Sequence, residues 1–245
     1  MTVQWEIKTG SHVGPSHERR GVENQDSMAW VSENNMMMIV VADGAGSLER
    51  SREGADFVVD HLTQLFTDYA HDDNSGDDVE SMQNFVDTAL RATRTALLAE
   101  DDAESKGCTV AVMVANEHGD WTAATVGDAF GVVVDIDHKY SYVSAPPQKY
   151  ANLTQLITVP REELLSINTA SGTMGKFFAV ATDGLSHASI YQQAPHENFW
   201  NSVFTGYESG TIDFNSLYDF MYSHNKIDDD TTLIVAYQST EQDTE

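Results

Sequence analysis

Four aspartates stand where strongly apolar runs of this sequence begin or end. Asp43 ends MMMIVVAD, Asp128 ends WTAATVGD, Asp183 ends FFAVATD, and Asp229 lies just before TTLIVAY. If the strand after Asp229 is antiparallel to its neighbours, all four carboxylates reach the same rim of a sheet. Asp26 opens another strand-like run in the same sense, so it is a fifth candidate for this cluster.

Such a cluster favours hard divalent cations, because repulsion and burial disfavour several ionised carboxylates without a counter-charge. Cys108 is the single cysteine and no histidine pair accompanies the aspartates, so oxygen ligands predict Mg²⁺ or Mn²⁺ rather than zinc. Gly44 and Gly184 follow two of the aspartates, and glycine lets a backbone carbonyl approach closely enough to be a ligand. Either Asp-Gly pair alone would mark only a turn. The strand-end aspartates together favour a cation site.

The charge balance excludes several kinds of partner. Asp and Glu number 39 against 13 Lys and Arg, and the formal net charge of −26 repels nucleic acid and anionic membrane surfaces. The first residues lack the features of a signal peptide, and no apolar run approaches the ~18 residues of a membrane span. We expect a cytoplasmic protein with no nucleic-acid or membrane partner. The absence of a heptad or apolar patch pattern makes a monomer the expected state.

Apolar, β-branched runs bounded by turn residues predict a series of strands. These runs are Gln4–Val13, Asp26–Val31, Met36–Ala42, Thr109–Ala115, Trp121–Val126, Gly131–Ile136, Lys176–Ala181 and Thr232–Tyr237, with weaker candidates at Tyr140–Val143 and Leu153–Thr158. Apolar residues at helical spacing predict helices over Ser51–Tyr69 and Val79–Ala99 and a further helical region over Phe199–His224.

The order of these elements predicts one layered α/β domain over residues 1–238. Strands with hairpin-like spacing, interrupted by paired helices, favour antiparallel sheets covered by helices on the outside rather than a Rossmann-type sheet. Residues 136–176 are expected to form a variable flap beside the site, where loops often select the substrate. Residues 239–245 are expected to be a disordered tail.

Six segments in this order resemble the type 2C metal-dependent serine/threonine phosphatases, in particular a bacterial subgroup. They are GPSHERRGVENQD (14–26), VADGAGS (41–47), GCTV (107–110), VGDA (126–129), ATDGL (181–185) and DDTTLIV (229–235). Each segment is weak evidence alone, but the ordered set is specific and spans almost the whole chain.

The resemblance implies a central antiparallel β-sandwich flanked by helices on both sides, an α-β-β-α arrangement, with two divalent cations at one end. By position, the implied ligands are Asp43 as the bridging carboxylate, the carbonyl of Gly44, Asp183, Asp229, and Asp26 directly or through water. Asp128 matches an aspartate associated with a third metal. Asp230 could exchange roles with Asp229, although the spacing to Thr232 favours Asp229.

The sequence also departs from the family pattern. Gln25 stands where an acidic residue is frequent, which would leave that position to bind water or support a ligand. His187 stands where Asp is frequent, which puts the third metal in doubt. Ala45 stands where some members carry a proton-donating histidine, so His17 is the candidate donor, beside metal-bound water. Arg20 is the first candidate for binding phosphate, with Arg19 second, because an arginine fork suits phosphate geometry. A surface role is the alternative for either arginine and for His17.

The leading hypothesis is hydrolysis of phosphoserine and phosphothreonine on proteins by a water that bridges two cations, Mn²⁺ or Mg²⁺. The substrate would be a phosphoprotein, with a cognate serine/threonine kinase as the opposing enzyme. The alternative is a catalytically weak phosphatase-like module that binds and regulates a phosphoprotein. A third hypothesis, an acidic metal buffer, predicts cation binding without hydrolysis.

Overall fold

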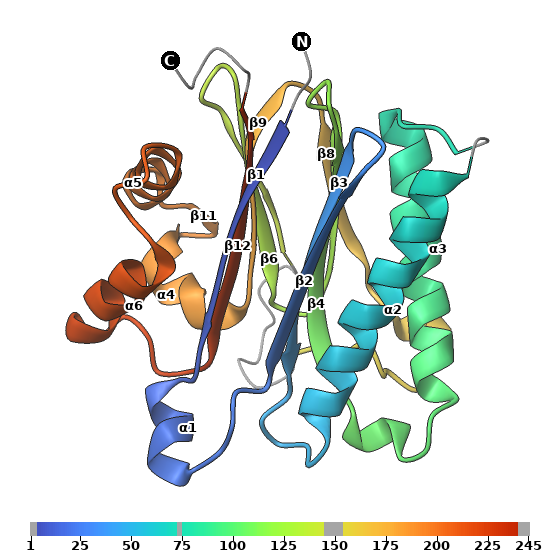
Figure 1. Ribbon diagram of the computed structural model, residues 1–245. Helices are drawn as coiled ribbons and strands as arrows, with labels where there is room; N and C mark the ends of the chain where they lie inside the picture. Colours follow the sequence, from blue (N-terminus) through green and yellow to red (C-terminus); the bar gives the residue numbers. More distant parts are fainter. Residues whose placement is uncertain (1–3, 73–74, 145–153, 240–245) are drawn as a thin grey trace.

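The computed structural model describes residues 4–72, 75–144 and 154–239. Two five-stranded antiparallel sheets pack face to face, and helices cover the outer face of each (Figure 1). The first sheet has the order β1 (Gln4–His12), β12 (Thr231–Ser239), β9 (Gly175–Ala181), β6 (Phe130–Asp135), β7 (Tyr140–Val143). The second has the order β2 (Asp26–Glu33), β3 (Met36–Gly44), β4 (Cys108–Asn116), β5 (Trp121–Val126), β8 (Asn168–Gly172).

Strand β3 shows why the central runs are apolar without alternation. Met38 and Val40 belong to the core between the second sheet and its helices, whereas Ile39 and Val41 belong to the core between the two sheets. Successive side chains of a strand point to opposite faces, so a strand covered on both faces is apolar throughout. Asp43 follows in the second of these series, and its side chain is therefore directed toward the space between the sheets.

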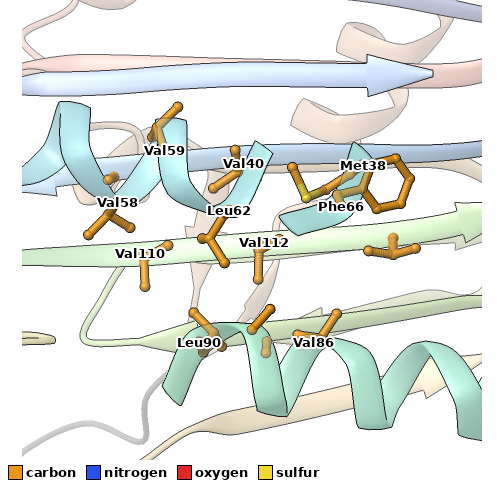
Figure 2. Packing of buried hydrophobic residues seen from close by; sticks show 14 of the residues in the cluster. Met38, Val40, Val58, Val59, Leu62, Phe66, Val86, Leu90, Val110 and Val112 are labelled. Atoms are coloured by element: carbon orange, nitrogen blue, oxygen red, sulfur yellow. The ribbon is translucent and has the colours of Figure 1, made fainter. Parts of the chain in front are cut away.

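Helices α2 (Ser51–His71) and α3 (Val79–Leu98) cover the second sheet. Val58, Leu62 and Phe66 recur every four residues along α2 and pack in one cluster with β3 and β4 (Figure 2). Helix α3 is capped by Asp78, the residue before its first turn, whose side chain accepts hydrogen bonds from two backbone N–H groups of that turn. The apolar stripe of α2 and the cap of α3 agree with the two helices predicted for these segments.

The first sheet is covered by α4 (Ser186–Ser189), α5 (Glu197–Glu208) and α6 (Phe214–Ser223). Trp200 and Phe204 of α5 and Leu217 and Met221 of α6 pack in the core against this sheet. A short ribbon of β10 (Ile190–Tyr191) and β11 (Ala194–Pro195) joins α4 to α5. The remaining helical turns are α1 (Pro15–Arg20), η1 (Ala103–Ser105), η2 (Glu162–Leu164) and η3 (Asp183–Leu185).

The predicted layered fold is confirmed, with corrections in detail. The weak strand at Leu153–Thr158 is wrong in its described part, because residues 154–158 contain no strand. The helical region Phe199–His224 is two helices, interrupted near Gly210, whose φ is 66°. Helix α1 and strand β8 lie where no element was predicted.

The ends of the predicted flap, residues 136–176, contribute strands to both sheets: β7 pairs with β6, and β8 pairs with β5. Its residues 145–153 lie outside the described part of the chain, and so do residues 240–245 of the predicted tail, whose first residue, Ser239, ends β12. Among the described helices, none is long and apolar enough to cross a membrane.

Candidate active site

Asp26 and Asp43 are paired directly across β2 and β3. Residues opposite each other on antiparallel strands point to the same face, so both carboxylates are directed toward the space between the sheets. Asp183 opens η3, with one residue between it and the end of β9 in the other sheet, and it lies close enough to Asp43 for its charge to add to burial in raising the pKa of that carboxyl group. The ends of the two sheets thus bring three of the predicted ligands together.

The carboxyl groups of this cluster are buried close to one another, so their ionised forms are unfavourable without a counter-charge. Burial raises the pKa of Asp26 to about 7, and the charges of Asp230 and Asp183 add to this effect. Burial raises the pKa of Asp43 well above its usual range, and neighbouring carboxylates raise it further. Burial, with the charges of Asp128 and Asp229, raises the pKa of Asp183 to about 6. Each of these carboxyl groups would ionise readily only beside a counter-charge.

The hydrogen bonds of Asp26 are incomplete. Its Oδ2 accepts a hydrogen bond from Thr182 Oγ1 at 2.8 Å, whereas its buried Oδ1 has no partner among the described residues. An unpaired buried oxygen is unfavourable unless a further group satisfies it. The open oxygen and the raised pKa together fit a divalent cation or its water.

Asp229 and Asp230 are adjacent but differ in surroundings. Asp230 is buried and accepts hydrogen bonds from the backbone nitrogens of Gly14 (2.7 Å) and Gln25 (2.7 Å), and its Oδ2 lies 2.8 Å from His17 Nδ1. Asp229 is exposed, and its carboxyl oxygen lies 3.7 Å from His17 Nε2. Asp230 therefore ties α1 and the chain before β2 to β12, which leaves Asp229 available as a ligand.

His17, Asp229 and Asp230 also place ligand atoms within 4.8 Å of one another, so the three could hold a cation on spacing alone. The hydrogen bonds within this group favour proton donation by His17 rather than metal binding by all three residues. Because a carboxylate only accepts, His17 Nδ1 donates to Asp230, and the Nε2 atom is the free one. His17 is buried with Nε2 turned toward Asp229, which is the position that a proton donor beside the cluster would need.

Three glycines permit the close backbone contacts of the site. A Cβ atom on Gly184 would lie 2.0 Å from the carbonyl oxygen of Asp230, and one on Gly14 would lie 2.2 Å from the carbonyl carbon of Asp229. A Cβ atom on Gly44 would lie 2.8 Å from a backbone carbonyl oxygen. Any side chain at these positions would push apart the segments that carry the aspartates.

Asp128 belongs to the same cluster. It follows Gly127, whose φ is 84°, and its charge raises the pKa values of Asp43 and Asp183. Thr154 Oγ1 donates a hydrogen bond of 2.6 Å to Asp128 Oδ2. This contact brings a described residue of the predicted flap beside the site.

The two candidate arginines lie at the end of α1, a short helix that starts with Pro15 and ends before Gly21 in the left-handed conformation. Arg19 Nη2 donates to Asp228 at 3.0 Å, whereas Arg20 Nε donates to the carbonyl of Ser16 at 3.1 Å. Both side chains are exposed and neither is bonded to the cluster in the described contacts. Arg20 is the one without an acidic partner there.

The three departures from the family pattern occupy different surroundings. Gln25 is buried, and its Oε1 has no hydrogen-bond partner among the described residues. Ala45 N donates to the carbonyl of Gly107 at 3.0 Å, which anchors the loop after β3. His187 is exposed on α4 and lines a cavity of about 250 Å³ together with Asp183 and Asp229.

The layered double sheet and its strand-end aspartates agree with the type 2C phosphatase class, and the family match assigns the chain to that class. The sequence matches the family model described as Protein phosphatase 2C over residues 13–216. The chain belongs to this family and is a protein serine/threonine phosphatase, which confirms the predicted resemblance, fold and enzyme class.

Relatives match over nearly the full length. Serine/threonine-protein phosphatase 3 of Escherichia coli (strain K12) is 28% identical over 257 residues, which cover 96% of this chain and 98% of that protein. A bacterial serine phosphatase structure superposes with a TM-score of 0.67 at 15% identity, covering 97% of this chain and 99% of that one. Serine/threonine phosphatase Stp1 from Staphylococcus aureus gives a TM-score of 0.66 at 15% identity, covering 97% and 96%. The solved structures show the shared fold.

Proposed function

We propose that this chain hydrolyses phosphoserine and phosphothreonine on proteins with two divalent cations, Mn²⁺ or Mg²⁺, bound at the carboxylate cluster. The observation that carries the proposal is the direct pairing of Asp26 and Asp43, two carboxyl groups whose pKa values are raised by burial and by neighbouring carboxylates. The ligand atoms proposed for these two cations are all oxygens, which suits hard cations.

The residues that would hold the cations are Asp26, Asp43, the carbonyl of Gly44, Asp183 and Asp229. When bound, the cations supply Lewis-acid activation of the attacking water and neutralise the charge of the phosphate. Asp128 would support a third, weaker metal, because it lies close enough to perturb Asp43 and Asp183.

The chain's own groups would orient the substrate and move the proton. Arg20 would bind phosphate oxygens from the end of α1, because its guanidinium has no acidic partner among the described residues. His17, fixed through Nδ1 by Asp230, would donate a proton from Nε2 to the leaving oxygen of the serine or threonine. Thr182 holds the Asp26 carboxylate in place through its 2.8 Å hydrogen bond.

The substrate, location and oligomeric state belong to the same proposal. The substrate would be a phosphoprotein made by a cognate serine/threonine kinase, and the chain would act in the cytoplasm as a monomer with residues 1–238 as one catalytic domain. The net charge of −26 supports the absence of nucleic-acid and anionic membrane partners.

The decisive experiment measures hydrolysis of an aryl phosphate and a phosphothreonine peptide with Mn²⁺, with Mg²⁺ and with chelator. We expect cation-dependent turnover of both substrates that is lost in Asp43→Asn. Folded, metal-binding protein without turnover on the peptide would contradict the proposal. Retained phosphopeptide binding would then favour a regulatory module, and cation binding alone would favour a metal buffer.

A further inference from the structure

An apolar groove lies on the outer side of the first sheet, enclosed by α4, the β10–β11 ribbon, α5 and α6. Its volume is about 620 Å³. Its apolar lining includes Ile190, Phe199, Val203, Ile212, Leu217 and Met221. Two lining residues are strongly exposed, Tyr191 at 66% and Phe220 at 57%. Exposed aromatic side chains beside a concave apolar surface are typical of a binding site.

The ionisable side chains of this groove are unlike those of the protein as a whole. The chain has 39 acidic and 13 Lys and Arg residues, yet no Asp or Glu is among the described residues that line the groove. The ionisable groups that face it, Tyr191 apart, are Lys226, His187 and His196. The net charge of the protein repels an acidic ligand, whereas in this groove such a ligand would meet Lys226 beside apolar side chains.

The groove adjoins the catalytic end of the molecule at His187. His187 lines the groove and also the cavity that contains Asp183 and Asp229. Helix α4, which carries His187, follows η3 directly, and η3 begins with Asp183. A peptide lying in the groove therefore leads toward the carboxylate cluster.

We propose that this groove binds the segment of the phosphoprotein substrate that flanks the phosphorylated residue, with an apolar side chain between α5 and α6 and an acidic side chain at Lys226. The inference rests on the proposed function and names a sequence preference for it. The chemistry of the lining selects an apolar and acidic flank over a polar and basic one.

The test compares two phosphothreonine peptides, one flanked by leucine and aspartate and the other by serine and lysine, with an aryl phosphate too small to reach the groove. We expect the wild type to prefer the apolar, acidic peptide by about tenfold in kcat/KM. Phe220→Ala and Lys226→Glu should each remove most of this preference and leave aryl phosphate turnover within about twofold.

Two exposed residues that do not line the groove provide matched controls. Tyr222 is 52% exposed on α6 but does not line the groove, and Lys139 is an exposed lysine in the turn between β6 and β7. Tyr222→Ala and Lys139→Glu should keep the peptide preference. Equal turnover of both peptides by the wild type, or equal loss in the control variants, would overturn the proposal.

Two further measurements distinguish failure of the groove proposal from failure of the proposed phosphatase activity. Fluorescence anisotropy of both peptides with the wild type in chelator reports binding without turnover, so a flank preference there supports the groove even if hydrolysis is absent. Aryl phosphate turnover without any flank preference refutes the groove alone. A wild-type dimer that Phe220→Ala dissociates, seen by sedimentation, would show that a second copy covers the groove and would overturn the assignment.

Discussion

Asp26 on β2 stands directly opposite Asp43 on β3, and both carboxyl groups lie at the end of the space between the two sheets. Like charges directly opposite on antiparallel strands destabilise the pairing, and burial strengthens the effect. The site is thus organised around a repulsion that only protons or cations relieve. The stability of the protein should report on this repulsion as clearly as its activity.

The first prediction concerns Asp26→Asn. In chelator at about pH 8, this variant should unfold at a higher temperature than the wild type, and its free energy of unfolding should be greater by on the order of a few kcal/mol, because it removes one buried charge. With Mn²⁺ the order should reverse, because the wild type gains more from the cation. Thermal unfolding under both conditions measures the effect. A lower midpoint for the variant in chelator would contradict the repulsion.

The second prediction concerns pH. Burial raises the pKa of Asp26 from 3.8 to about 7 and that of Asp183 to about 6 in the cation-free chain. A carboxyl group whose pKa is higher in the folded state stabilises the fold fully below its unfolded pKa, and this contribution is lost as pH rises through the folded value. In chelator, the advantage of Asp26→Asn over the wild type should therefore grow from about pH 4 to about pH 7.

Urea unfolding of both proteins across that range gives the difference in the free energy of unfolding. Saturating Mn²⁺ should flatten the dependence, because the cation competes with the proton. A difference that stays constant with pH would show that Asp26 titrates normally in the folded chain.

The third prediction compares the adjacent residues Asp229 and Asp230. Asp230→Ala removes the acceptor of two buried backbone N–H groups and of His17, so it should destabilise the fold by about 2–5 kcal/mol. Asp229→Ala changes an exposed side chain and should cost within about 1 kcal/mol. It should nevertheless lower turnover by more than the ~10–100-fold typical of residues that only support a metal ligand.

Urea unfolding and aryl phosphate kinetics separate the two roles. A stable Asp230→Ala protein with weak cation affinity, beside an active Asp229→Ala protein, would reverse the assignment of ligand and anchor.

Much of the fold could be predicted from the sequence, because apolar runs and helical spacing report burial directly. Strand β8 could not, since its sequence NTASG has little apolar character and forms a strand only by pairing with β5. Helix α1 carried the signals of Pro15 at its start and Gly21 at its end, but six residues are too few for a periodic pattern.

The sequence predicted the positions of those aspartates that stand at the ends of strands. The positions of Asp26, Asp43, Asp128 and Asp183 followed from where strand-like runs begin or end. The sequence DDD favoured Asp229 over Asp230 only through the spacing to Thr232, because the difference between them depends on hydrogen bonds from Gly14, His17 and Gln25, more than 200 residues away in the chain. The apolar groove is likewise a tertiary feature, since α4, α5 and α6 form it together.

The fourth prediction concerns Gly184→Ala. The new Cβ atom would lie 2.0 Å from the carbonyl oxygen of Asp230, so the backbone of η3 or β12 must move. We expect a loss of about 1–3 kcal/mol or more in the free energy of unfolding and a large loss of turnover, because Asp183 moves with its neighbour. Gly46→Ala is the matched control, since its nearest contact would be 3.5 Å away. Equal stability of the two variants would contradict the close approach.

The last prediction concerns the two arginines of α1. Arg19 is paired with Asp228, whereas Arg20 donates only to the Ser16 carbonyl among the described contacts, so Arg20 is the one free to turn toward phosphate. Arg20→Ala should raise KM for an aryl phosphate by about tenfold and Arg20→Lys by less, because lysine keeps the charge but loses the fork. Arg19→Ala should change KM by no more than about twofold, since exposed ion pairs contribute little. Steady-state kinetics at saturating Mn²⁺ distinguish the three variants, and a larger effect at Arg19 than at Arg20 would exchange their roles.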